Sequence, residues 1–360
     1  MEKEILTFVV PAYNAASTIN RTIDSILTQN CDRYKIIIIN DGSTDSTDEI
    51  GKNYAKKYPE KIKYIYQNNR GLGGARNHGI DLADTPYIVF LDSDDWLMPG
   101  YVEKVVQQII NNIEDTPQII LTLPQVYNEN SKLIDDWYDK ELFQTLFKKD
   151  GDLVNPQQDK MIYQTDVNQC RKILQVEFIK KIKFKFRERV KWEDVYPHFY
   201  LLSHCRKCMG IGSTGFYYRK GNLGQITETR GKDRLDLIIV INDLLKYVFK
   251  VEQGKKMLQM MKYPMMKIMV SFANEGIRMA DMDTRRELVN ELHKTFKQIP
   301  ASFYRELKRE GKKYCSNSEM RQYKLFMGII KRKILIRLFY DYFYRDASEI
   351  LVKRFIKLKR

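Results

Sequence analysis

The chain has 360 residues, of which 43% are hydrophobic and 30% are charged, and its formal net charge is +15. This length allows two domains, or one large domain with an appendage. The charge is uneven, because residues 1–100 carry 11 Lys and Arg against 14 Asp and Glu, whereas residues 311–360 carry 14 against 4. An acidic first segment argues against a nucleic-acid groove, so no nucleic-acid partner is expected, and the basic end suggests a surface-binding tail.

The five cysteines are odd in number and scattered, which argues against a disulfide framework and indicates a reducing cytoplasm. The charged first residues and the short apolar stretch after them do not match a signal peptide. The chain has no run of roughly 18 or more apolar residues, so no membrane-spanning helix is expected. We therefore expect a cytoplasmic protein.

Four apolar segments predict buried strands over residues 6–10, 34–40, 62–66 and 87–91, and a helix is expected between each pair. This alternation predicts an α/β fold with a parallel sheet that is covered on both faces. Pro11 cannot donate a hydrogen bond to a sheet, so the first strand is expected to stop there or to reach an edge.

Polar residues follow three of these strands: Pro11 and Tyr13 after the first, Asp41 after the second, and Asp92 with Asp94 after the fourth. Carboxyl ends of parallel strands share one sheet edge, where ligands bind in open α/β sheets, so a nucleotide is expected there. The glycine-rich stretch over residues 71–74 matches neither a P-loop nor Gly-x-Gly-x-x-Gly.

Asp92 and Asp94 are two residues apart, so on an extended chain their side chains point the same way. Converging carboxylates repel each other unless a cation lies between them, and oxygen ligands suit Mg²⁺ or Mn²⁺. The alternative is a solvated acidic turn that caps the next helix. The pair alone does not decide between the two.

Residues 101–230 are less regular. Their pattern predicts a helix over 101–113, a strand over 119–126, a polar loop over 151–169 and a strand over 215–220. The acidic pair Glu193 and Asp194 follows Trp192 and precedes an apolar helix. From about residue 232 the apolar period becomes helical and stays so to the end of the chain.

Six short motifs occur in one order between residues 5 and about 227. They are Val10-Pro11-Ala12-Tyr13-Asn14, Asn40-Asp41-Gly42-Ser43-Thr44-Asp45, Gly74-Ala75-Arg76-Asn77, Leu91-Asp92-Ser93-Asp94-Asp95, Trp192-Glu193-Asp194 and Tyr218-Arg219. Together they resemble the inverting family 2 glycosyltransferases with the GT-A fold, of the type that builds bacterial cell-surface polysaccharide, capsule or wall polymer.

The resemblance implies a UDP-sugar donor and a site for it at the sheet edge. Tyr13 would stack on uracil and Asp41 would accept from its N3–H. Asp94 would hold Mn²⁺ or Mg²⁺ on the diphosphate, and Asp92 would face the ribose and contribute to the metal site. The residues that the resemblance places at the nucleotide-sugar are Pro11, Tyr13, Asp41, Asn69, Arg76, Asp92, Ser93 and Arg219.

The resemblance also implies the reaction. Asp194 matches the general base that takes the proton of an acceptor hydroxyl as its oxygen attacks the anomeric carbon, and Glu193 is the next candidate. One base and no covalent nucleophile imply single displacement with inversion. The expected enzyme is a hexosyl- or N-acetylhexosaminyl-transferase acting on a glycan, lipid-linked or wall-polymer acceptor.

The resemblance divides the chain into a GT-A catalytic domain over residues 1–230 and a helical region over 231–360. Within the first, residues 1–100 form the nucleotide-binding half and residues 101–230 the acceptor-binding half. Two other classes are kept as alternatives: a nucleotidyltransferase or sugar-nucleotide pyrophosphorylase, and a non-catalytic basic protein that binds membranes or nucleic acid.

The last segment, residues 321–360, has apolar residues at spacings of three and four with basic residues between them, which is typical of an amphipathic helix. Two explanations are left open. The apolar face packs on the preceding helices or on a second subunit of a homo-oligomer, or the helix makes a peripheral contact with the anionic inner membrane face.

Overall fold

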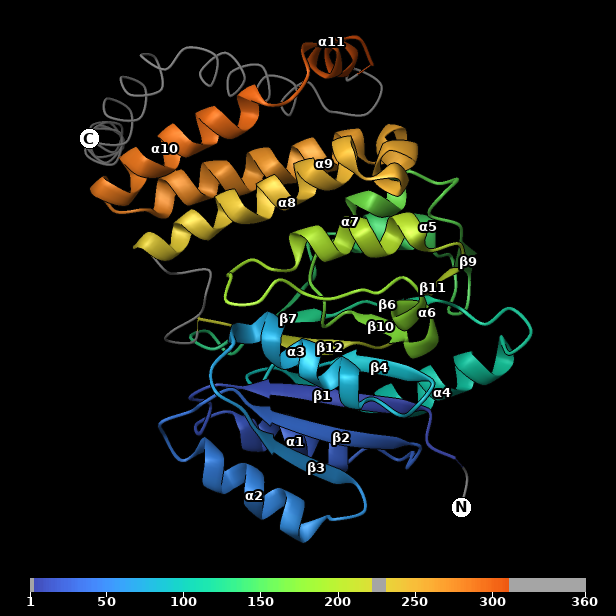
Figure 1. Ribbon diagram of the computed structural model, residues 1–360. Coiled ribbons are helices and arrows are strands. Elements are labelled where there is room, and N and C mark those ends of the chain that lie inside the picture. Colours follow the sequence, from blue (N-terminus) through green and yellow to red (C-terminus); the bar gives the residue numbers. More distant parts are fainter. Residues whose placement is uncertain (1–2, 222–230, 311–360) are drawn as a thin grey trace, which may run out of the picture. The chain divides into compact units, whose positions relative to one another are not determined.

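The computed structural model describes residues 3–221 and 231–310 (Figure 1). The chain forms two compact units, one of residues 1–225 with 252–260 and the other of residues 226–251 with 261–360. The predicted amphipathic tail, residues 321–360, lies outside the described residues.

The first unit is built on the four parallel strands that the apolar segments predict, in the order β3-β2-β1-β4. β1 pairs in parallel with β2 and β4, and β2 with β3. These strands are rich in Ile and Val, and β1, β2 and β4 are almost wholly buried, as expected of a sheet covered on both faces. Their bounds are Leu6–Ala12 for β1, Tyr34–Asn40 for β2, Ile62–Tyr66 for β3 and Tyr87–Phe90 for β4.

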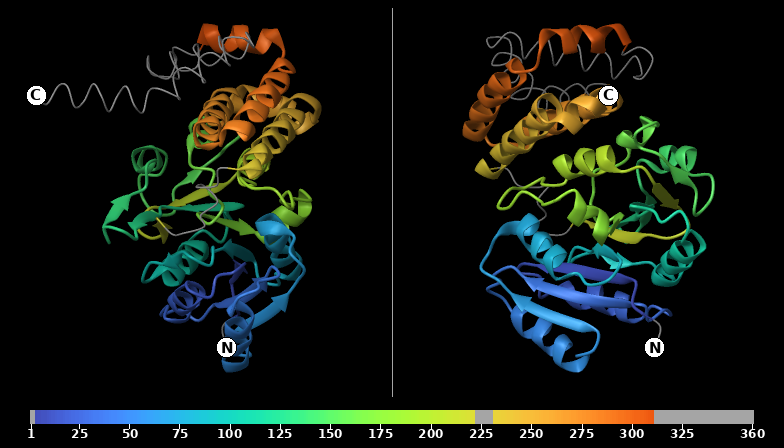
Figure 2. Two further views of the ribbon diagram at one scale, coloured as in Figure 1. Left: turned by 90° about the vertical axis from the view of Figure 1, so that its left-hand side faces the viewer. Right: turned by 45° about the vertical axis from the view of Figure 1, so that its right-hand side comes forward.

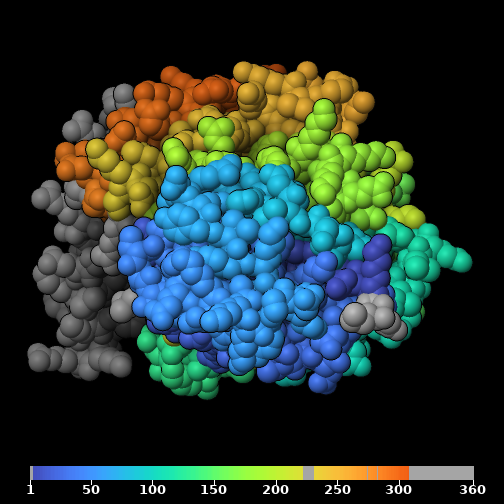
Figure 3. Space-filling model, turned by 60° about the horizontal axis from the view of Figure 1, so that its bottom comes forward, coloured from blue at the N-terminus to red at the C-terminus, as the bar shows by residue number. Residues whose placement is uncertain are grey.

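Helices cover both faces of these strands (Figures 1 and 2). α1 (Ile19–Leu27), α2 (Thr47–Lys57) and α4 (Tyr101–Asn111) share one apolar core with the sheet. α3 (Gly71–Leu82) packs on the other face, where a Cβ at Gly79 would lie 2.4 Å from Cγ1 of Val9. Figure 3 shows the surface that the N-terminal residues, drawn in blue, form on the α2 side.

The sheet continues beyond β4 to eight strands, in the order β4-β10-β6-β11-β9. β10 is antiparallel to both neighbours, whereas β11 is parallel to β6. The mostly parallel sheet agrees with the predicted fold class, although the pattern did not predict β10 or β11. The bounds are Lys172–Gln175 for β10, Ile119–Thr122 for β6, Cys208–Ile211 for β11 and Leu153–Val154 for β9.

The prediction of one strand over residues 119–126 is wrong. The chain changes sheets at Leu123 and Pro124, because Pro124 lacks the N–H that a continued strand would need. After the break β7 joins a second, four-stranded sheet with the order β5-β12-β7-β8. Its bounds are Trp96–Leu97 for β5, Phe216–Lys220 for β12, Gln125–Asn128 for β7 and Ile134–Asp136 for β8.

Shorter helices complete the first unit, and the described part of the second unit is helical, as the period predicts. α10 begins where the carboxylate of Asp281 accepts from N of Thr284 at 2.8 Å, and it packs on α8. None of the helices in residues 3–221 and 231–310 combines the length and apolar character needed to cross a bilayer. The bounds are Lys140–Leu146 for α5, Met161–Gln164 for η1, Val176–Lys181 for α6, Val195–His204 for α7, Lys232–Leu235 for η3, Asp236–Lys250 for α8, Glu252–Met279 for α9, Met282–Lys297 for α10 and Ala301–Glu310 for α11.

Candidate active site

The carboxyl ends of β1, β2, β3 and β4 lie at one edge of the sheet, as parallel pairing requires. β1 does not stop at Pro11 but continues to Ala12, and of the two expectations for Pro11 it is the edge position that the structure shows, on the β4 side. The pairing of β1 with β4 ends at Val9 and Phe90. Backbone groups alternate in direction along β1, so the nitrogen of Pro11 faces the β4 side, where pairing has already ended. The missing N–H of Pro11 therefore leaves no acceptor of β4 unpaired.

The first two loops at this edge are tied together by Asn14. Oδ1 of Asn14 accepts from N of Thr44 at 2.8 Å, and N of Asn14 donates to Oγ of Ser43 at 3.0 Å. Asn14 has φ 49°, in the left-handed region that Asn tolerates better than most residues. Tyr13, beside it, has a side chain that is 55% exposed, so its ring face is accessible for stacking.

Asp41 organises the loop after β3. Its side chain is 3% exposed, and Oδ1 accepts from Nε2 of Gln67 at 2.6 Å and from N of Arg70 at 2.8 Å. The amide of Asn69 is used inside the same loop, since Nδ2 donates to the backbone oxygen of Asp41 at 3.0 Å. Among the described residues Oδ2 of Asp41 has no hydrogen-bond donor, so this oxygen is left for a ligand.

The acidic segment after β4 is a turn. N of Asp95 donates to the backbone oxygen of Asp92 at 3.0 Å, which closes a turn with Ser93 and Asp94 at its centre. Asp92 and Asp94 therefore lie in a turn and not on an extended chain, which corrects the prediction. All three side chains between Asp92 and Asp94 are partly exposed.

Asp95 is the buried member of this turn, 1% exposed, and the sequence reasoning gave it no role. Its Oδ1 accepts from N of Arg219 on β12 at 2.9 Å, whereas its Oδ2 has no partner among the described residues. Burial, and then the charges of Asp94 and Asp92, raise the pKa of Asp95 well above its ordinary value.

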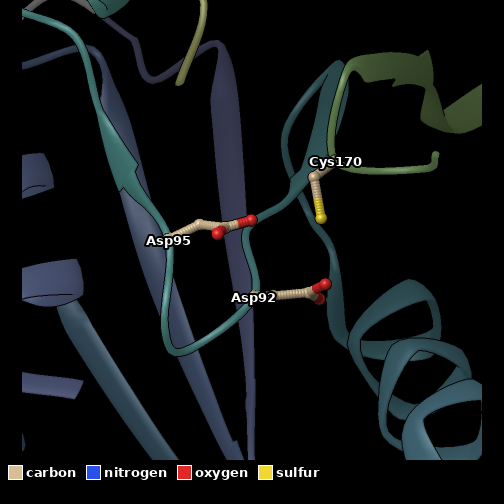
Figure 4. Close-up of side chains that lie close together, drawn as sticks. All are labelled: Asp92, Asp95 and Cys170. Carbon is tan, nitrogen blue, oxygen red and sulfur yellow. The ribbon is translucent and has the colours of Figure 1, made fainter. Parts of the chain in front are cut away.

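Asp92, Asp95 and Cys170 converge, with one potential ligand atom of each within 4.8 Å of the others (Figure 4). The unpartnered, buried Oδ2 of Asp95 and the partly exposed carboxylates of Asp92 and Asp94 fit a hard divalent cation such as Mg²⁺ or Mn²⁺. Cys170 fits it poorly, because burial raises the pKa of its thiol well above the ordinary value. Sulfur suits softer ions, so the oxygens are the better donor set.

Arg76 lies at the centre of the site. Its side chain is 1% exposed, Nη1 donates to Oε1 of Glu193 at 2.6 Å and to Oδ1 of Asp194 at 2.8 Å, and Nη2 donates to Oδ1 of Asp92 at 3.0 Å. One guanidinium therefore joins the end of β4 to the start of α7. Its Nε has no partner among the described residues. Contact of Nη1 or Nη2 with a phosphate would require these pairs to open.

The charges in this group shift one another's protonation. Burial alone would lower the pKa of Arg76, but Asp194, Asp92 and Glu193 raise it well above its ordinary value. Burial raises the pKa of both Glu193 and Asp194, and Arg76 opposes both shifts. Glu193 is 4% exposed, whereas the Asp194 side chain is 21% exposed, so Asp194 is the carboxylate that a substrate can reach.

The segment that carries Glu193 and Asp194 is held against α3. Asn77 exchanges two hydrogen bonds with the backbone of Phe186, at 3.0 and 2.8 Å, and a Cβ at Gly73 would lie 2.1 Å from the backbone oxygen of Arg187. Arg70 and Glu188 form an ion pair with two hydrogen bonds. The glycines of the Gly-rich stretch therefore allow this segment to approach the helix closely.

A second support of Asp194 comes from the turn before β10. N of Gln169 donates to Oδ2 of Asp194 at 3.3 Å, and Nζ of the buried Lys172 donates to the backbone oxygens of Val167 at 2.8 Å and Asn168 at 2.7 Å. Burial lowers the pKa of Lys172 to about 7. The sequence showed no signal for these residues, because they lie at the end of the predicted loop over 151–169 or directly after it.

The remaining predicted residues lie around the turn. Arg219 is on β12, and its Nε donates to Oε2 of Glu129 at 2.7 Å, a partner that the sequence did not indicate. Ser93 lies within the turn itself. The structure thus brings to one sheet edge the residues predicted for the nucleotide, the metal and the base, which are Pro11, Tyr13, Asp41, Asn69, Arg76, Asp92, Ser93, Asp94, Glu193, Asp194 and Arg219.

This sheet with an acidic turn at its carboxyl edge defines a GT-A-type α/β domain, and solved structures share the fold. TarS of S. aureus, residues 1–349 in complex with UDP-GlcNAc, has a TM-score of 0.60 at 17% identity and covers 83% of this chain and 82% of that chain. GalNAc-T7 with UDP, GalNAc and Mn²⁺ has a TM-score of 0.53 at 14% identity and covers 76% of this chain and 58% of that chain.

Sequence comparison identifies a family segment. The model described as glycosyl transferase family 2 matches residues 7–171, so this part of the chain is similar to that family. EpsH of Bacillus subtilis (strain 168) is 35% identical over 135 residues, which is 38% of either chain. The glycosyltransferase GlyA of Streptococcus pneumoniae serotype 4 is 40% identical over 105 residues, which is 29% of this chain and 15% of GlyA. The chain thus matches well under two thirds of the length of these relatives.

Proposed function

We propose that the chain is an inverting glycosyltransferase that moves a sugar from a UDP-sugar to a hydroxyl of a glycan or cell-surface polymer. The observation that carries the proposal is the Arg76 group, which joins the acidic turn after β4 to a partly exposed carboxylate, Asp194. The family match over residues 7–171 and the UDP-GlcNAc in the TarS complex support it.

Asp194 is the general base in this proposal. It takes the proton of the acceptor hydroxyl, the acceptor oxygen forms a bond to the anomeric carbon, and the bond from that carbon to the UDP oxygen breaks. The described site offers Asp194 for this step because Glu193 is buried beside it. The raised pKa of Asp194 makes its carboxylate a stronger proton acceptor than an ordinary Asp.

For the donor, we propose that Tyr13 stacks on the uracil and that Oδ2 of Asp41 accepts from its N3–H, with Pro11 and Asn69 shaping the loops around them. Mn²⁺ or Mg²⁺, held by Asp92 and Asp94, would supply charge neutralisation of the leaving diphosphate. The Mn²⁺ in the GalNAc-T7 structure supports this choice of ion. Ser93 and Arg219 lie beside the same turn and are proposed donor contacts.

The proposal predicts metal-dependent binding of UDP. UDP should bind in the presence of Mn²⁺, and EDTA or Asp94→Ala should weaken binding by roughly tenfold or more, because two phosphate charges would then face the carboxylates unneutralised. Titration calorimetry measures this. The matched control is Asp115→Ala, which removes an exposed carboxylate that pairs with Lys207. Unchanged UDP affinity for Asp94→Ala in EDTA would contradict the metal role.

The product separates this proposal from the alternative enzyme class. Incubation with a panel of UDP-sugars and Mn²⁺ should release UDP, whereas a nucleotidyltransferase or pyrophosphorylase would release or consume pyrophosphate. Ion-pair chromatography of the nucleotides distinguishes the two. Pyrophosphate-dependent turnover without UDP would overturn the proposed function.

We also propose that residues 321–360 give the chain a peripheral contact with an anionic membrane surface at the cytoplasmic face, where a lipid-linked or wall-polymer acceptor would be met. Each basic residue near such a surface adds about 1 kcal/mol. Full-length protein should float with anionic liposomes at low salt and lose this binding at high salt. Flotation of a chain truncated after residue 320 to the same extent would instead assign the tail to packing or to a homo-oligomer.

A further inference from the structure

Two aromatic residues, Trp137 and Tyr138, directly follow β8 of the second sheet. Trp137 is 7% exposed and its ring meets that of Tyr218 edge-on, with the centroids 5.5 Å apart. Tyr138 is 76% exposed, more than any other large hydrophobic side chain that the structure describes, and its ring stacks on Trp137. An aromatic ring that is presented to solvent on a buried aromatic support is a rigid apolar surface.

Unused polar groups surround these rings. Nε1 of Trp137, Oδ1 of Asp139 and Nη2 of Arg171 are buried and have no partner within residues 3–221 and 231–310. Asp139 and Arg171 are joined by a single hydrogen bond, from Nη1 to Oδ2 at 2.6 Å. Because buried polar groups are nearly always hydrogen-bonded to protein, water or ligand, this cluster has unused hydrogen-bonding capacity beside the rings.

The same region reaches Asp194 through one turn. Asp166 accepts from the hydroxyl of Tyr138, and N of Asp166 donates to Oδ2 of Asp139 at 2.8 Å. Three residues further on, Gln169 donates to Asp194. Three residues span at most ~10 Å of chain, so a short segment links the partner of the exposed ring to the carboxylate proposed as the base.

We propose that Tyr138, Trp137 and Asp166 form a binding subsite for a neutral sugar ring of the acceptor, an inference that rests on the proposed function. The ring of Tyr138 offers the apolar face of a sugar a flat contact, and the carboxylate of Asp166 accepts from its hydroxyls. The charge disfavours phosphate, since residues 129–141 and Asp166 carry six Asp and Glu, against two Lys in the same segment and the paired Arg171 and Arg219. The acceptor is therefore held here through an uncharged sugar and not through a phosphate-bearing unit.

The test uses the full chain with UDP and Mn²⁺ present, and four methyl β-glycosides as probes: those of glucose, galactose, N-acetylglucosamine and N-acetylgalactosamine. Saturation-transfer NMR titrations give their Kd values. At least one glycoside should bind, and Tyr138→Ala should raise its Kd by about tenfold, the size of one well-placed aromatic contact. sn-Glycerol 3-phosphate should give no transfer in the same experiment.

Tyr54→Phe is the matched control for Tyr138→Phe, because the Tyr54 hydroxyl donates to the carboxylate of Asp24 at 2.7 Å on another part of the first unit. Only Tyr138→Phe should weaken glycoside binding, by about two- to threefold. UDP affinity is measured in every sample. If UDP binds normally and no glycoside binds, or if Tyr138→Ala binds glycosides as the wild type does, the subsite is overturned. If UDP itself does not bind, it is the proposed function that fails.

Discussion

Replacing Asp194 with Asn should lower kcat for sugar transfer by about 10² to 10⁴, the range that general-base catalysis contributes. Asn keeps the shape of the side chain and can still accept from Arg76, but it cannot take a proton from the acceptor hydroxyl. Because Asp194 shares no hydrogen bond or ion pair with Tyr13 or Asp41, the proposed uracil contacts, in the part of the chain that the structure describes, the Kd of UDP should change little. Steady-state kinetics and UDP calorimetry on the same preparation measure the two quantities.

The control for Asp194→Asn is Glu193→Gln. Glu193 is buried and accepts from the same Nη1 of Arg76, so its amide variant disturbs the same group without removing the exposed carboxylate. Glu193→Gln should retain more activity than Asp194→Asn by tenfold or more, as an order-of-magnitude estimate. The reverse order would make Glu193 the base. Turnover of Asp194→Asn within a few-fold of wild type would place the base elsewhere.

Arg76→Met should lower the free energy of unfolding by about 3–5 kcal/mol, the usual cost of removing one partner from a buried ion pair. The substitution leaves Asp92, Glu193 and Asp194 without the guanidinium that all three contact. Met has a similar length and flexible packing, so the loss reports charge more than volume. Urea unfolding at pH 8, followed by circular dichroism, measures it.

The loss in Arg76→Met should depend on pH with a definite sign. The folded protein already holds Glu193 and Asp194 with raised pKa values. As pH rises above the ordinary pKa values of these acids, the unfolded chain releases protons that the folded state retains, so stability falls. Removing the cation raises the folded pKa values further, so the deficit of the variant should be smallest near pH 5 and should grow toward pH 8.

Arg70→Met is the matched control for Arg76→Met. Arg70 also pairs with a carboxylate of the 186–194 segment, but the side chains of Arg70 and Glu188 are 42% and 36% exposed. Exposed pairs contribute about 0–1 kcal/mol. Equal unfolding midpoints for Arg76→Met and wild type at pH 8 would show that the buried group does not need its cation.

The apolar runs predicted the nucleotide-binding half of the fold well, because β1, β2 and β4 are buried on both faces and read as continuous Ile and Val segments. β10 was missed for the opposite reason. It begins with Lys172, a residue type that normally indicates an exposed position, yet here it is fully buried. Three backbone oxygens accept hydrogen bonds from its Nζ, and the sequence pattern does not predict these contacts.

The sequence predicted individual residues of the site but not the contacts between them. Asp41, Asp92 and Asp194 could be named from short motifs, since each follows or precedes a recognisable element. Their mutual contacts could not be derived, because Arg76 joins residues 16 to 118 positions away along the chain. Asp95 and Cys170 were overlooked for a related reason, as only the turn and the approach of β10 bring them together.

The close contact between Gly73 and the backbone of Arg187 also bears on how such domains can diversify. The segment that carries Glu193 and Asp194 packs closely on α3. Its backbone approaches Gly73, which has no side chain, and its carboxylates bind Arg76 of the same helix. Recombination that exchanged residues 101–221 for those of a relative would pack the relative's segment against α3 of this chain. Chimeras of this kind should therefore remain folded and active only when both surfaces descend from the same parent.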